Sequence, residues 1–410
     1  MMRLAIVGVT GYGWGLVQKI NAASEKLGCR LVAAADDQLA KLPERAKELE
    51  DAGVELFDDA LVMFEALRGK CEGVYIATGI GSHAPLAIAA ARAGYHVHLE
   101  KPPAATVQEV DAMLTAFAEA ERFCLVGFQA LHSPDVAFIK ERIVDGRLGR
   151  VTSLTCRAGW PRNKGYYGRN AWAGNLRHGN AWVLDGPAMN ALAHQVTNML
   201  FLASPEAGRL ATPASVRAEL YVANAIESHD TAAIEIHTAE GPTAWFLASH
   251  CSDESFGPIT EIEAEGGHVV WPMWKPAVAT YADGTQESSV GDKEMGRDRM
   301  IANFVEAVRE GDGSLLRCPL SETRQFVLAL DGAHESSRHI QRIAAPHARR
   351  VDEPTPEART IVDGMDEWLV RCAERRCLFS RLPDAPPWAV ATEAFDMAGY
   401  TRFPVQFDAE

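Results

Sequence analysis

The chain has 410 residues, enough for about two to four domains of ordinary size. Its 40 Lys and Arg against 55 Asp and Glu give a net charge of −15, which argues against a nucleic-acid partner, because such partners are bound largely through their phosphates. With 47% hydrophobic and 23% charged residues, the composition is that of an ordinary globular protein and excludes a disordered or membrane-embedded chain.

The eight cysteines show no CxxC pair and no regular spacing, so the sequence predicts reduced thiols without a disulfide framework. We expect no metal site, because His229 with Asp230 and His250 with Cys251 do not have ligand spacing. The N-terminal run MMRLAIVGV is too short for the apolar core of a signal peptide, and no stretch approaches the roughly 18 uncharged apolar residues of a membrane-spanning helix. These features predict a cytoplasmic protein without a membrane partner.

The first 130 residues alternate short apolar runs with helical stretches, an order typical of a parallel sheet covered by helices on both faces. The runs predict strands at residues 4–9, 30–35, 73–78, 95–100 and 123–128. Apolar residues three and four apart predict helices between them, for example at 84–94 and 107–121. We expect an α/β fold in which residues 1–130 form a doubly wound sheet of nucleotide-binding type.

Residues 131–345 contain longer alternating segments joined by turn residues, which predict a second α/β domain on a largely antiparallel open sheet with helices on one face. The expected strands lie at 151–160, 215–224, 231–239, 243–251 and 260–271, and the expected helices at 185–203, 298–311 and 323–343. A Pro-punctuated C-terminal extension, residues 346–410, contains an amphipathic helix near 361–372. We expect this extension to pack on the core or on a neighbouring subunit.

A glycine-rich turn, GVTGYGWG at residues 8–15, separates the first predicted strand from the helix after it. Strand, tight turn and helix in this order place a pyrophosphate at a helix N-terminus, where backbone N–H groups bind anions. The spacing is GxTxxG, with Thr10 where the dinucleotide fingerprint has its second glycine and Gly11 beside it. We expect a dinucleotide to bind Gly8, Thr10, Gly11, Tyr12 and Gly13.

Asp36 and Asp37 follow the second predicted strand, at the distance expected for a carboxylate that hydrogen-bonds a cofactor ribose. A carboxylate at this point disfavours the 2′-phosphate of NADP by charge repulsion, so NAD is favoured over NADP. The alternative is that both acids are turn residues that cap the next helix.

A second motif, HVHLEKPPAAT, places Glu100 and Lys101 at the end of the fourth predicted strand. Open α/β sheets bind their ligands at this carboxyl edge. Such a pair is, taken alone, more often a surface ion pair. Pro102 favours a site, because it keeps Lys101 out of the helical region and so fixes its direction.

The run GVYIATGIGSHAPLAIAAARAGYHVHLEKPPAAT resembles the signature of the Gfo/Idh/MocA oxidoreductases, and the later run GFQALHSPDVAFIKERIVDGRLGRVTSL is similar to the segment after that signature in the family. The resemblance covers about residues 3–345 and implies a Rossmann domain, NAD(P) as cofactor and a sugar or polyol as substrate. It implies that Lys101 reaches both the nicotinamide ribose and the substrate hydroxyl, where an ammonium stabilises the developing alkoxide. The expected cofactor-binding residues then also include Thr78, His83, Glu100 and Gln129.

A third motif lies in WVLDGPAMNALAHQVTNMLFL, where Pro187 suits the first turn of a helix and Asp185 is expected as a cap or turn residue. Asn190, His194 and Asn198 recur at four-residue spacing, which predicts one polar face on an otherwise apolar helix. The family has an Asp followed four residues later by a His that serves as general base, which implies that role for His194. Asn190 departs from this pattern, because an amide stabilises an imidazolium less than a carboxylate does. The alternative is a buried helix whose polar side chains only satisfy one another.

Between Arg150 and Leu184 there are six Lys or Arg residues and no Asp or Glu. The same stretch is rich in aromatic and amide side chains, which suit a carbohydrate ring, while Arg suits a carboxylate or phosphate. We expect a polyhydroxylated substrate, with a sugar acid or another anionic sugar suited to the basic charge. The expected substrate-binding residues are Trp160, Arg162, Tyr167, Arg169, Trp172, Asn190 and His194. The alternative is a long surface loop whose aromatics anchor it or pack a subunit contact.

These motifs predict an oxidoreductase in which His194 accepts the hydroxyl proton, Lys101 stabilises the oxyanion and hydride passes to NAD. The resemblance also implies a homodimer or homotetramer formed through the exposed face of the second sheet. Two alternatives stay open. One is a non-catalytic regulatory protein that binds dinucleotide and sugar, which Asn190 would suit, and the other is an enzyme that uses NAD in a redox-neutral cycle to process glycosides.

Overall fold

The computed structural model describes residues 1–409, which form two compact units. The first comprises Met1–Ala104, Gln108–His132 and Gly296–Arg324, and the second comprises Ala105–Val107, Ser133–Met295 and residues 325–409. The predicted boundaries, 1–130, 131–345 and 346–410, divide the chain into consecutive pieces. The structure instead places residues 296–324 in the first unit, because α9 (Arg297–Glu310) buries its apolar side in the core of that unit.

The first unit is built on a six-stranded parallel sheet in the order β3-β2-β1-β4-β5-β6, which is the strand order of a Rossmann domain. Its strands are β1 (Met2–Val7), β2 (Cys29–Ala35), β3 (Glu55–Phe57), β4 (Gly73–Ile76), β5 (His96–Leu99) and β6 (Cys124–Val126). The sequence predicts five of these strands. It misses β3, because this edge strand has three residues and none of them is buried.

Helices between the strands complete the first unit. They are α1 (Gly11–Leu27), α2 (Pro43–Asp51), α3 (Ala60–Ala66), α4 (Ile80–Arg92) and α5 (Val107–Glu119). One apolar cluster joins β1 and β2 to α1 and α9, with Leu4, Ile6, Ile20 and Phe304 fully buried in it. Burial of such side chains contributes about 1.5–3 kcal/mol each and fixes the helix that follows the glycine turn.

The second unit contains a ten-stranded sheet in the order β16-β15-β14-β13-β7-β12-β11-β10-β17, with β20 also paired to β10. Its main strands are β7 (Val151–Gly159), β10 (Pro213–Val222), β11 (Thr231–Thr238), β12 (Thr243–Ser249), β13 (Phe256–Ala264), β14 (Gly267–Pro272), β15 (Val278–Tyr281) and β16 (Gln286–Ser288). Short strands β17 (Gln341–Arg342) and β20 (Phe395–Asp396) complete it. Only the β7–β12 and β10–β17 pairs are parallel, so the predicted fold class is confirmed.

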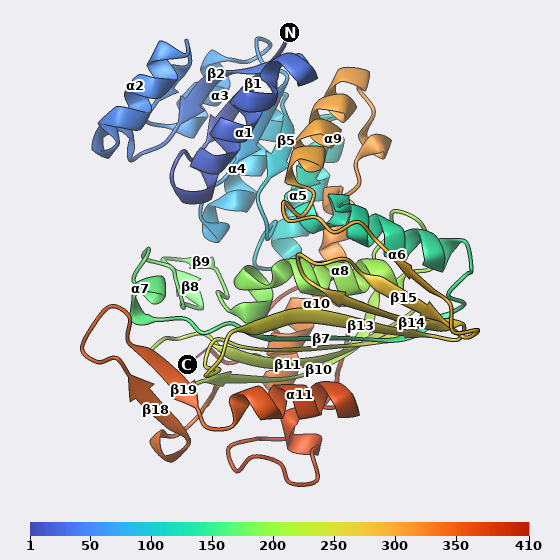
Figure 1. Cartoon of the computed structure of the whole chain (residues 1–410). Helices are drawn as coiled ribbons and strands as arrows, with labels where there is room; N and C mark the ends of the chain where they lie inside the picture. The colour runs from blue at the N-terminus through green and yellow to red at the C-terminus, as the bar shows by residue number, and fades with distance from the viewer. Residues whose placement is uncertain (410) are drawn as a thin grey trace. The chain divides into compact units, whose positions relative to one another are not determined.

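Helices cover this sheet on both faces near β7 and β12 (Figure 1). Helix α8 (Ala193–Ala203) contacts these strands from one side, and α11 (Met365–Arg375) contacts them from the other. The C-terminal extension packs on its own unit, since Leu369 and Phe379 share an apolar cluster with Tyr221 and Leu247 of the sheet.

The sequence predicts that one face of this sheet is exposed, and in the structure that face is partly covered. Its centre is covered by α11, which presents apolar side chains to it. The same face carries ion pairs between neighbouring strands, Arg157 with Glu261 at 2.8 Å and Arg217 with Glu235 at 3.5 Å. Because these charged residues alternate with apolar residues along the strands, the overall composition of the strands does not reveal the ion pairs.

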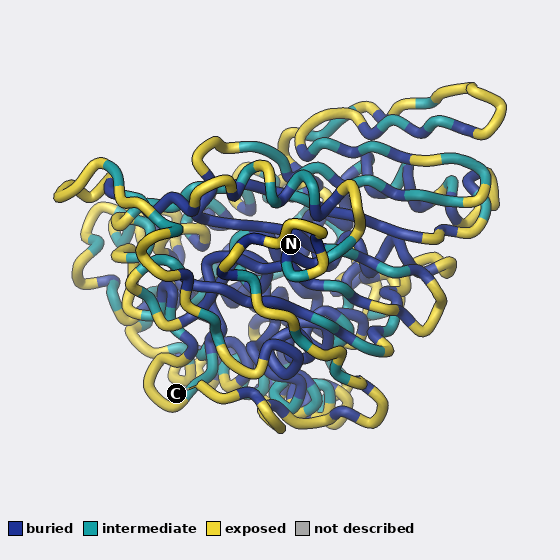
Figure 2. The backbone as a smooth tube through the Cα atoms, turned by 90° about the horizontal axis from the view of Figure 1, so that it is seen from below, coloured by how far each residue is buried: buried dark blue, intermediate teal, exposed yellow. Residues whose placement is uncertain are grey.

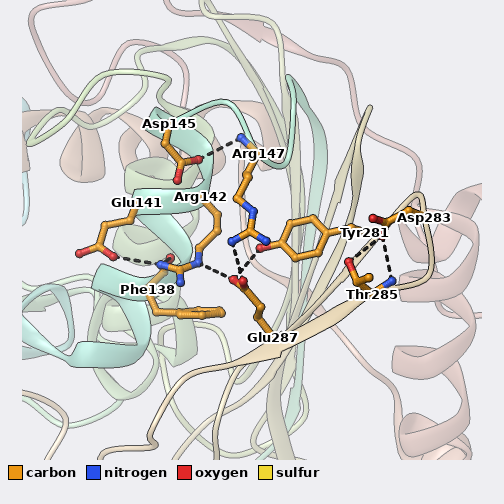
Figure 3. A network of polar contacts seen from close by, with 9 residues as sticks. All are labelled: Phe138, Glu141, Arg142, Asp145, Arg147, Tyr281, Asp283, Thr285 and Glu287. Atoms are coloured by element: carbon orange, nitrogen blue, oxygen red, sulfur yellow. Dashed lines mark hydrogen bonds and ion pairs between the residues drawn. The ribbon is translucent and has the colours of Figure 1, made fainter.

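A polar network joins the end of α6 (Pro134–Val144) to the β15–β16 hairpin (Figure 3). The Glu287 carboxylate accepts hydrogen bonds from Arg147, from Arg142 Nε at 3.2 Å and from the Tyr281 hydroxyl at 3.0 Å. These donors, Arg147 first, hold the pKa of Glu287 below its ordinary value. The network fixes the outer strands of the second sheet.

Most strand residues are buried or half-buried, and Figure 2 shows exposed stretches mostly where the chain turns back at the surface. No helix within residues 1–409 is long and apolar enough to cross a membrane. The same residues contain no group of three or more His, Cys, Asp or Glu side chains placed to hold a metal ion.

Candidate active site

Two close backbone approaches shape the glycine turn after β1. A Cβ atom on Gly8 would lie 2.4 Å from the carbonyl oxygen of Ala77, and a Cβ atom on Gly13 would lie 2.1 Å from the carbonyl oxygen of Gly8. Helix α1 begins at Gly11, after the extended N-cap residue Thr10, so its first N–H groups lie at the carboxyl end of β1. Side chains at Gly8 and Gly13 would collide with the backbone of this cradle, so both glycines allow the tight turn that presents the helix N-terminus to a pyrophosphate.

Asp36 follows β2 and is 9% exposed. Its Oδ2 accepts a 2.8 Å hydrogen bond from the Val9 N–H, and its Oδ1 accepts one of 2.8 Å from the Gln38 N–H. The carboxylate thus braces the glycine turn and also turns the chain after β2. A carboxylate has about four acceptor positions, so two remain for ribose hydroxyls.

Gln129 follows β6, and its side-chain oxygen accepts hydrogen bonds from the Tyr12 hydroxyl at 2.7 Å and from Arg297 Nε at 3.2 Å. The Arg297 guanidinium also lies 5.2 Å from the centre of the Tyr12 ring. The structure thus brings together two of the expected cofactor residues, Tyr12 and Gln129. The sequence misses Arg297, because it starts α9 and no motif connects it to the glycine turn.

His83 joins the segments that follow β4 and β5. Its buried ring has Nδ1 2.7 Å from the carbonyl oxygen of Pro102 and Nε2 3.0 Å from that of Thr78. Burial lowers the pKa of His83, so the ring is neutral at pH 7 and only one nitrogen donates. The Thr78 hydroxyl accepts a 2.8 Å hydrogen bond from Ser82. The His83 ring therefore donates to one of these two carbonyl oxygens and lies between the segment after β4 and the segment after β5.

Glu100 and Lys101 follow β5 at the same edge of the sheet. Glu100 is 7% exposed, and a Cβ atom on Gly127 would lie 2.8 Å from its Oε1, so glycine leaves the room for the carboxyl group. Burial raises the pKa of Glu100 to about 7, against the opposing effect of the Lys101 charge. The Lys101 backbone N–H lies 3.3 Å from Glu100 Oε2, and Lys101 itself is half-buried.

In the second unit, the segment that carries Asn190 and His194 is not the continuous α-helix that the sequence predicts. Residues Pro187–Ala191 form a π-type turn, in which the Leu192 N–H bonds the carbonyl oxygen of Pro187 at 2.7 Å, and α8 starts only at Ala193. The wide turn breaks the 3.6-residue period. His194 and Asn198 lie four residues apart within α8, as predicted, whereas Asn190 lies in the π-type turn before this helix.

Asn190 and His194, the two candidate site residues, are accessible within an otherwise buried segment. Among residues 183–204, all described, only Asn190, Ala191 and His194 are not buried. The rest of the segment, including Asn198, belongs to the protein interior. A ligand that reaches this segment meets the two polar side chains that the sequence singles out.

Asp185, expected as a cap or turn residue, is the centre of a buried hydrogen-bond network. It is 3% exposed, and its Oδ1 accepts a 2.8 Å hydrogen bond from Asn190 Nδ2. Its Oδ2 accepts hydrogen bonds from the Gly174 N–H at 2.7 Å and from Arg169 at 3.5 Å. Asp185 thus ties Asn190 to the basic segment before it. The signal in the sequence was its position directly after a stretch, residues 150–184, that contains no Asp or Glu.

Guanidinium groups and aromatic rings alternate through the basic segment. The stack consists of Trp172, Arg169, Tyr166, Arg162, Trp160 and Trp274. The guanidinium carbons lie between 3.7 and 5.3 Å from the adjacent ring centres, and the two last Trp rings stack with centres 5.9 Å apart. Four of the expected substrate residues belong to this stack. The sequence misses Trp274, which is 44% exposed and lies far along the chain after β14.

Tyr167, also expected to bind substrate, has its hydroxyl 3.2 Å from Nδ1 of His250. Burial, with the charges of Arg162 and Arg169, lowers the pKa of His250 well below its ordinary value, and burial raises the pKa of Tyr167. Both groups are therefore neutral at pH 7. His250 is a buried anchor that fixes the Tyr167 side chain.

Comparison with known proteins adds a family match. Residues 2–128 match the GFO_IDH_MocA model, described as an oxidoreductase family with an NAD-binding Rossmann fold. This match confirms the expected resemblance and the NAD-binding class of the first unit.

Two relatives show how far the likeness extends. Levoglucosan dehydrogenase of Pseudarthrobacter phenanthrenivorans is 42% identical over 81 residues, which are 20% of this chain and 21% of that enzyme. Inositol 2-dehydrogenase of Rhizobium meliloti is 24% identical over 311 residues, which are 73% of this chain and 88% of that enzyme. The chain thus spans about a fifth of the first relative and most of the second.

A solved structure shares the fold of both units. The WlbA dehydrogenase of Bordetella pertussis, in complex with NADH and UDP-GlcNAcA, is 24% identical with a TM-score of 0.67, and the match covers 82% of this chain and 96% of that chain. This likeness agrees with the predicted combination of a parallel and a largely antiparallel sheet.

Proposed function

We propose, on the premise that residues 2–128 match the GFO_IDH_MocA model of NAD-binding oxidoreductases, that the chain transfers a hydride between nicotinamide and a secondary alcohol of a sugar, a sugar acid or a cyclic polyol. The observation that carries the proposal is the carboxyl edge of the parallel sheet. There the glycine turn, Asp36, Thr78 and Lys101 follow β1, β2, β4 and β5. The names of the levoglucosan and inositol dehydrogenases support the substrate class.

The bound dinucleotide would supply the hydride acceptor. In the proposal, the helix N-terminus at Gly11 and the cradle of Gly8 and Gly13 hold its pyrophosphate, and Asp36 binds its adenosine ribose. The Asp36 carboxylate would repel a 2′-phosphate, so we propose NAD as the preferred cofactor. The proposed set is completed by Thr10, Tyr12, Thr78, His83, Glu100, Lys101 and Gln129.

On the substrate side, His194 accepts the hydroxyl proton and Lys101 stabilises the negative charge that develops on the oxygen. Asn190 holds the reacting group in place. The stack of rings and guanidinium groups offers apolar faces to the C–H bonds of a sugar ring and positive charge to a carboxylate. Arg162, Arg169 and Tyr167 therefore favour a sugar acid over a neutral sugar.

Purified protein tests this proposal with NAD and a panel of inositols, neutral aldoses and the matching uronic acids, followed by NADH absorbance. We expect turnover with at least one member and a higher kcat/KM for a uronic acid than for its neutral counterpart. Turnover with neutral sugars alone would contradict the anionic part. Tight NADH binding without turnover on any member would instead support a regulatory protein, and cleaved glycoside with the cofactor recovered as NAD would support a redox-neutral cycle.

We also propose a cytoplasmic homodimer or homotetramer. The outer strands β14 to β16 contribute no residue to the apolar cluster of α11, and β16 is the edge strand at this end of the sheet, which leaves surface for self-association. Light scattering of the purified protein tests the oligomeric state, and a monomer at working concentration would contradict it.

A further inference from the structure

Asp185 fixes the orientation of a side-chain amide. Its hydrogen-bond partners are the Gly174 N–H, the Arg169 guanidinium and the side chain of Asn190 at 2.8 Å. A carboxylate accepts hydrogen bonds, so the end of the Asn190 amide that faces Asp185 is its NH2 group. The oxygen and nitrogen of an amide are otherwise hard to tell apart, and this partner removes the ambiguity.

The orientation of the Asn190 amide determines which of its two ends is the more accessible one. Asp185 is 3% exposed, whereas Asn190 is half-buried. With its NH2 group turned to the buried carboxylate, the amide has its carbonyl oxygen at the more accessible end. The more accessible end of Asn190 is therefore a hydrogen-bond acceptor with partial negative charge.

The backbone holds both residues in place. The Asp185 N–H bonds the carbonyl oxygen of Asn175 at 3.1 Å, and the Asn190 N–H bonds that of Gly186 at 3.0 Å. The π-type turn between them brings the two side chains together across five residues of sequence. π-type turns of this kind are frequent at functional sites.

We propose that Asp185 is a positioning residue, which acts through Asn190 so that the amide presents its carbonyl oxygen to the substrate hydroxyl and to the imidazolium formed at His194. The proposal rests on the function proposed above, in which His194 is the base. The charge of Asp185 polarises the amide and increases the negative charge on its oxygen. The pair thereby supplies part of the stabilisation that a carboxylate at position 190 would give.

Three variants separate this role from a purely structural one. Asp185→Asn removes the charge, Asn190→Asp places two carboxyl groups in contact, and the double variant restores one carboxylate and one amide in reversed order. We expect each single variant to lower kcat about tenfold or more, with the Kd for NADH unchanged, and the double variant to regain most of the lost kcat. A double variant that folds and is no more active than the single variants would overturn the proposal.

A second Asp–Asn pair in the same unit provides a matched control. Asn224 Nδ2 donates a 2.9 Å hydrogen bond to the buried carboxylate of Asp230, and neither residue belongs to the proposed substrate set. Asp230→Asn is expected to lower Tm, as Asp185→Asn does, while kcat stays within about twofold of the unmodified chain. A loss of kcat in Asp230→Asn as large as in Asp185→Asn would show that Asp185 acts only through stability.

Nuclear magnetic resonance of the free protein tests the orientation without turnover. The Asn190 side-chain NH2 is expected to exchange slowly with water, as that of Asn224 does, whereas the NH2 of exposed Asn180 exchanges rapidly. In Asp185→Asn the Asn190 signal should move and exchange faster. Rapid exchange of Asn190 in the unmodified chain would overturn the positioning role. A slow Asn190 amide in a protein that turns over no sugar or polyol would leave the Asp185 contact intact and defeat the proposed function instead.

Discussion

The carboxyl group of Glu100 lies so close to Gly127 that a Cβ atom at position 127 would be 2.8 Å from Glu100 Oε1. The absence of a side chain after β6 is what allows β5 to end in a buried carboxyl group next to Lys101. β5 and β6 are neighbours in the parallel sheet. Gly127 therefore helps to position the carboxyl group beside Lys101, the residue proposed to stabilise the reacting oxygen.

Gly127→Ala should displace the Glu100 carboxyl group. We expect the free energy of unfolding to fall by about 1–3 kcal/mol, as for other overpacked positions, and NADH to bind more weakly. Denaturant unfolding and NADH fluorescence measure the two effects. Gly15→Ala is the control, because a Cβ atom there meets nothing within 4 Å, and alanine inside helix α1 should be neutral or stabilising by about 0.5–1 kcal/mol. Equal stability of the two variants would contradict the steric argument.

Glu100→Gln should change how stability depends on pH. Because burial raises the pKa of Glu100 to about 7, the folded chain holds this proton where the unfolded chain, with a glutamate pKa of about 4.3, has lost it. The stability of the unmodified chain relative to Glu100→Gln should therefore fall as pH rises from about 4.5 to 7 and then level off. Thermal unfolding of both proteins across this range measures the difference. A difference independent of pH would show that folding does not change the pKa of Glu100.

Leu369→Ala tests whether the C-terminal extension is part of the second core. Leu369 is fully buried on α11, in the cluster that includes Leu247 of the sheet, so its truncation should cost about 2–5 kcal/mol. Glu374→Ala, at an exposed position of the same helix, should change stability by less than about 0.5 kcal/mol. Urea unfolding compares them. Similar midpoints for both variants would mean that α11 contributes little to the fold.

Glu287→Gln should remove stability that is present at neutral pH and absent in acid. The pKa of Glu287 is lowered, chiefly by its hydrogen bond with Arg147, so its contribution exists above the unfolded value of about 4.3 and is lost as pH falls through the lower folded value. The unmodified chain should exceed Glu287→Gln in stability near neutral pH, and the difference should shrink as the pH falls below about 4.3. Unfolding curves at several pH values check this. A gap that widens in acid would contradict the network drawn in Figure 3.

The cofactor half of the site could be predicted because it depends on strand ends. Asp36, Thr78 and Lys101 each follow a short apolar strand, and parallel strands bring their carboxyl ends to one edge whatever lies between them. Arg297 could not be predicted in this way. Arg297 bonds Gln129 because α9 belongs to the first unit, although residues 133–295 before it belong to the second. The sequence around Arg297 does not reveal this assignment.

For the proposed substrate site, the sequence predicts the residue types but not the backbone conformation that carries them. A π-type turn and an α-helix bury the same apolar residues, so the sequence pattern could not reveal that the chain widens at Pro187–Ala191. Asn190 therefore lies in this turn and not in α8, and its side chain donates a hydrogen bond to Asp185. The ion pair of Arg157 with Glu261 depends on the register between β7 and β13, which alternation alone does not set.

The most direct test of the proposed chemistry follows the hydride itself. The best substrate from the sugar and polyol panel, deuterated at the carbon that bears the reacting hydroxyl, is incubated with NAD and the protein, and the reduced cofactor is analysed by mass spectrometry. We predict NADH that carries the deuterium, with formation abolished in His194→Ala and strongly reduced in Lys101→Ala. Oxidation of the substrate without deuterium in NADH, or unchanged transfer in His194→Ala, would contradict the account.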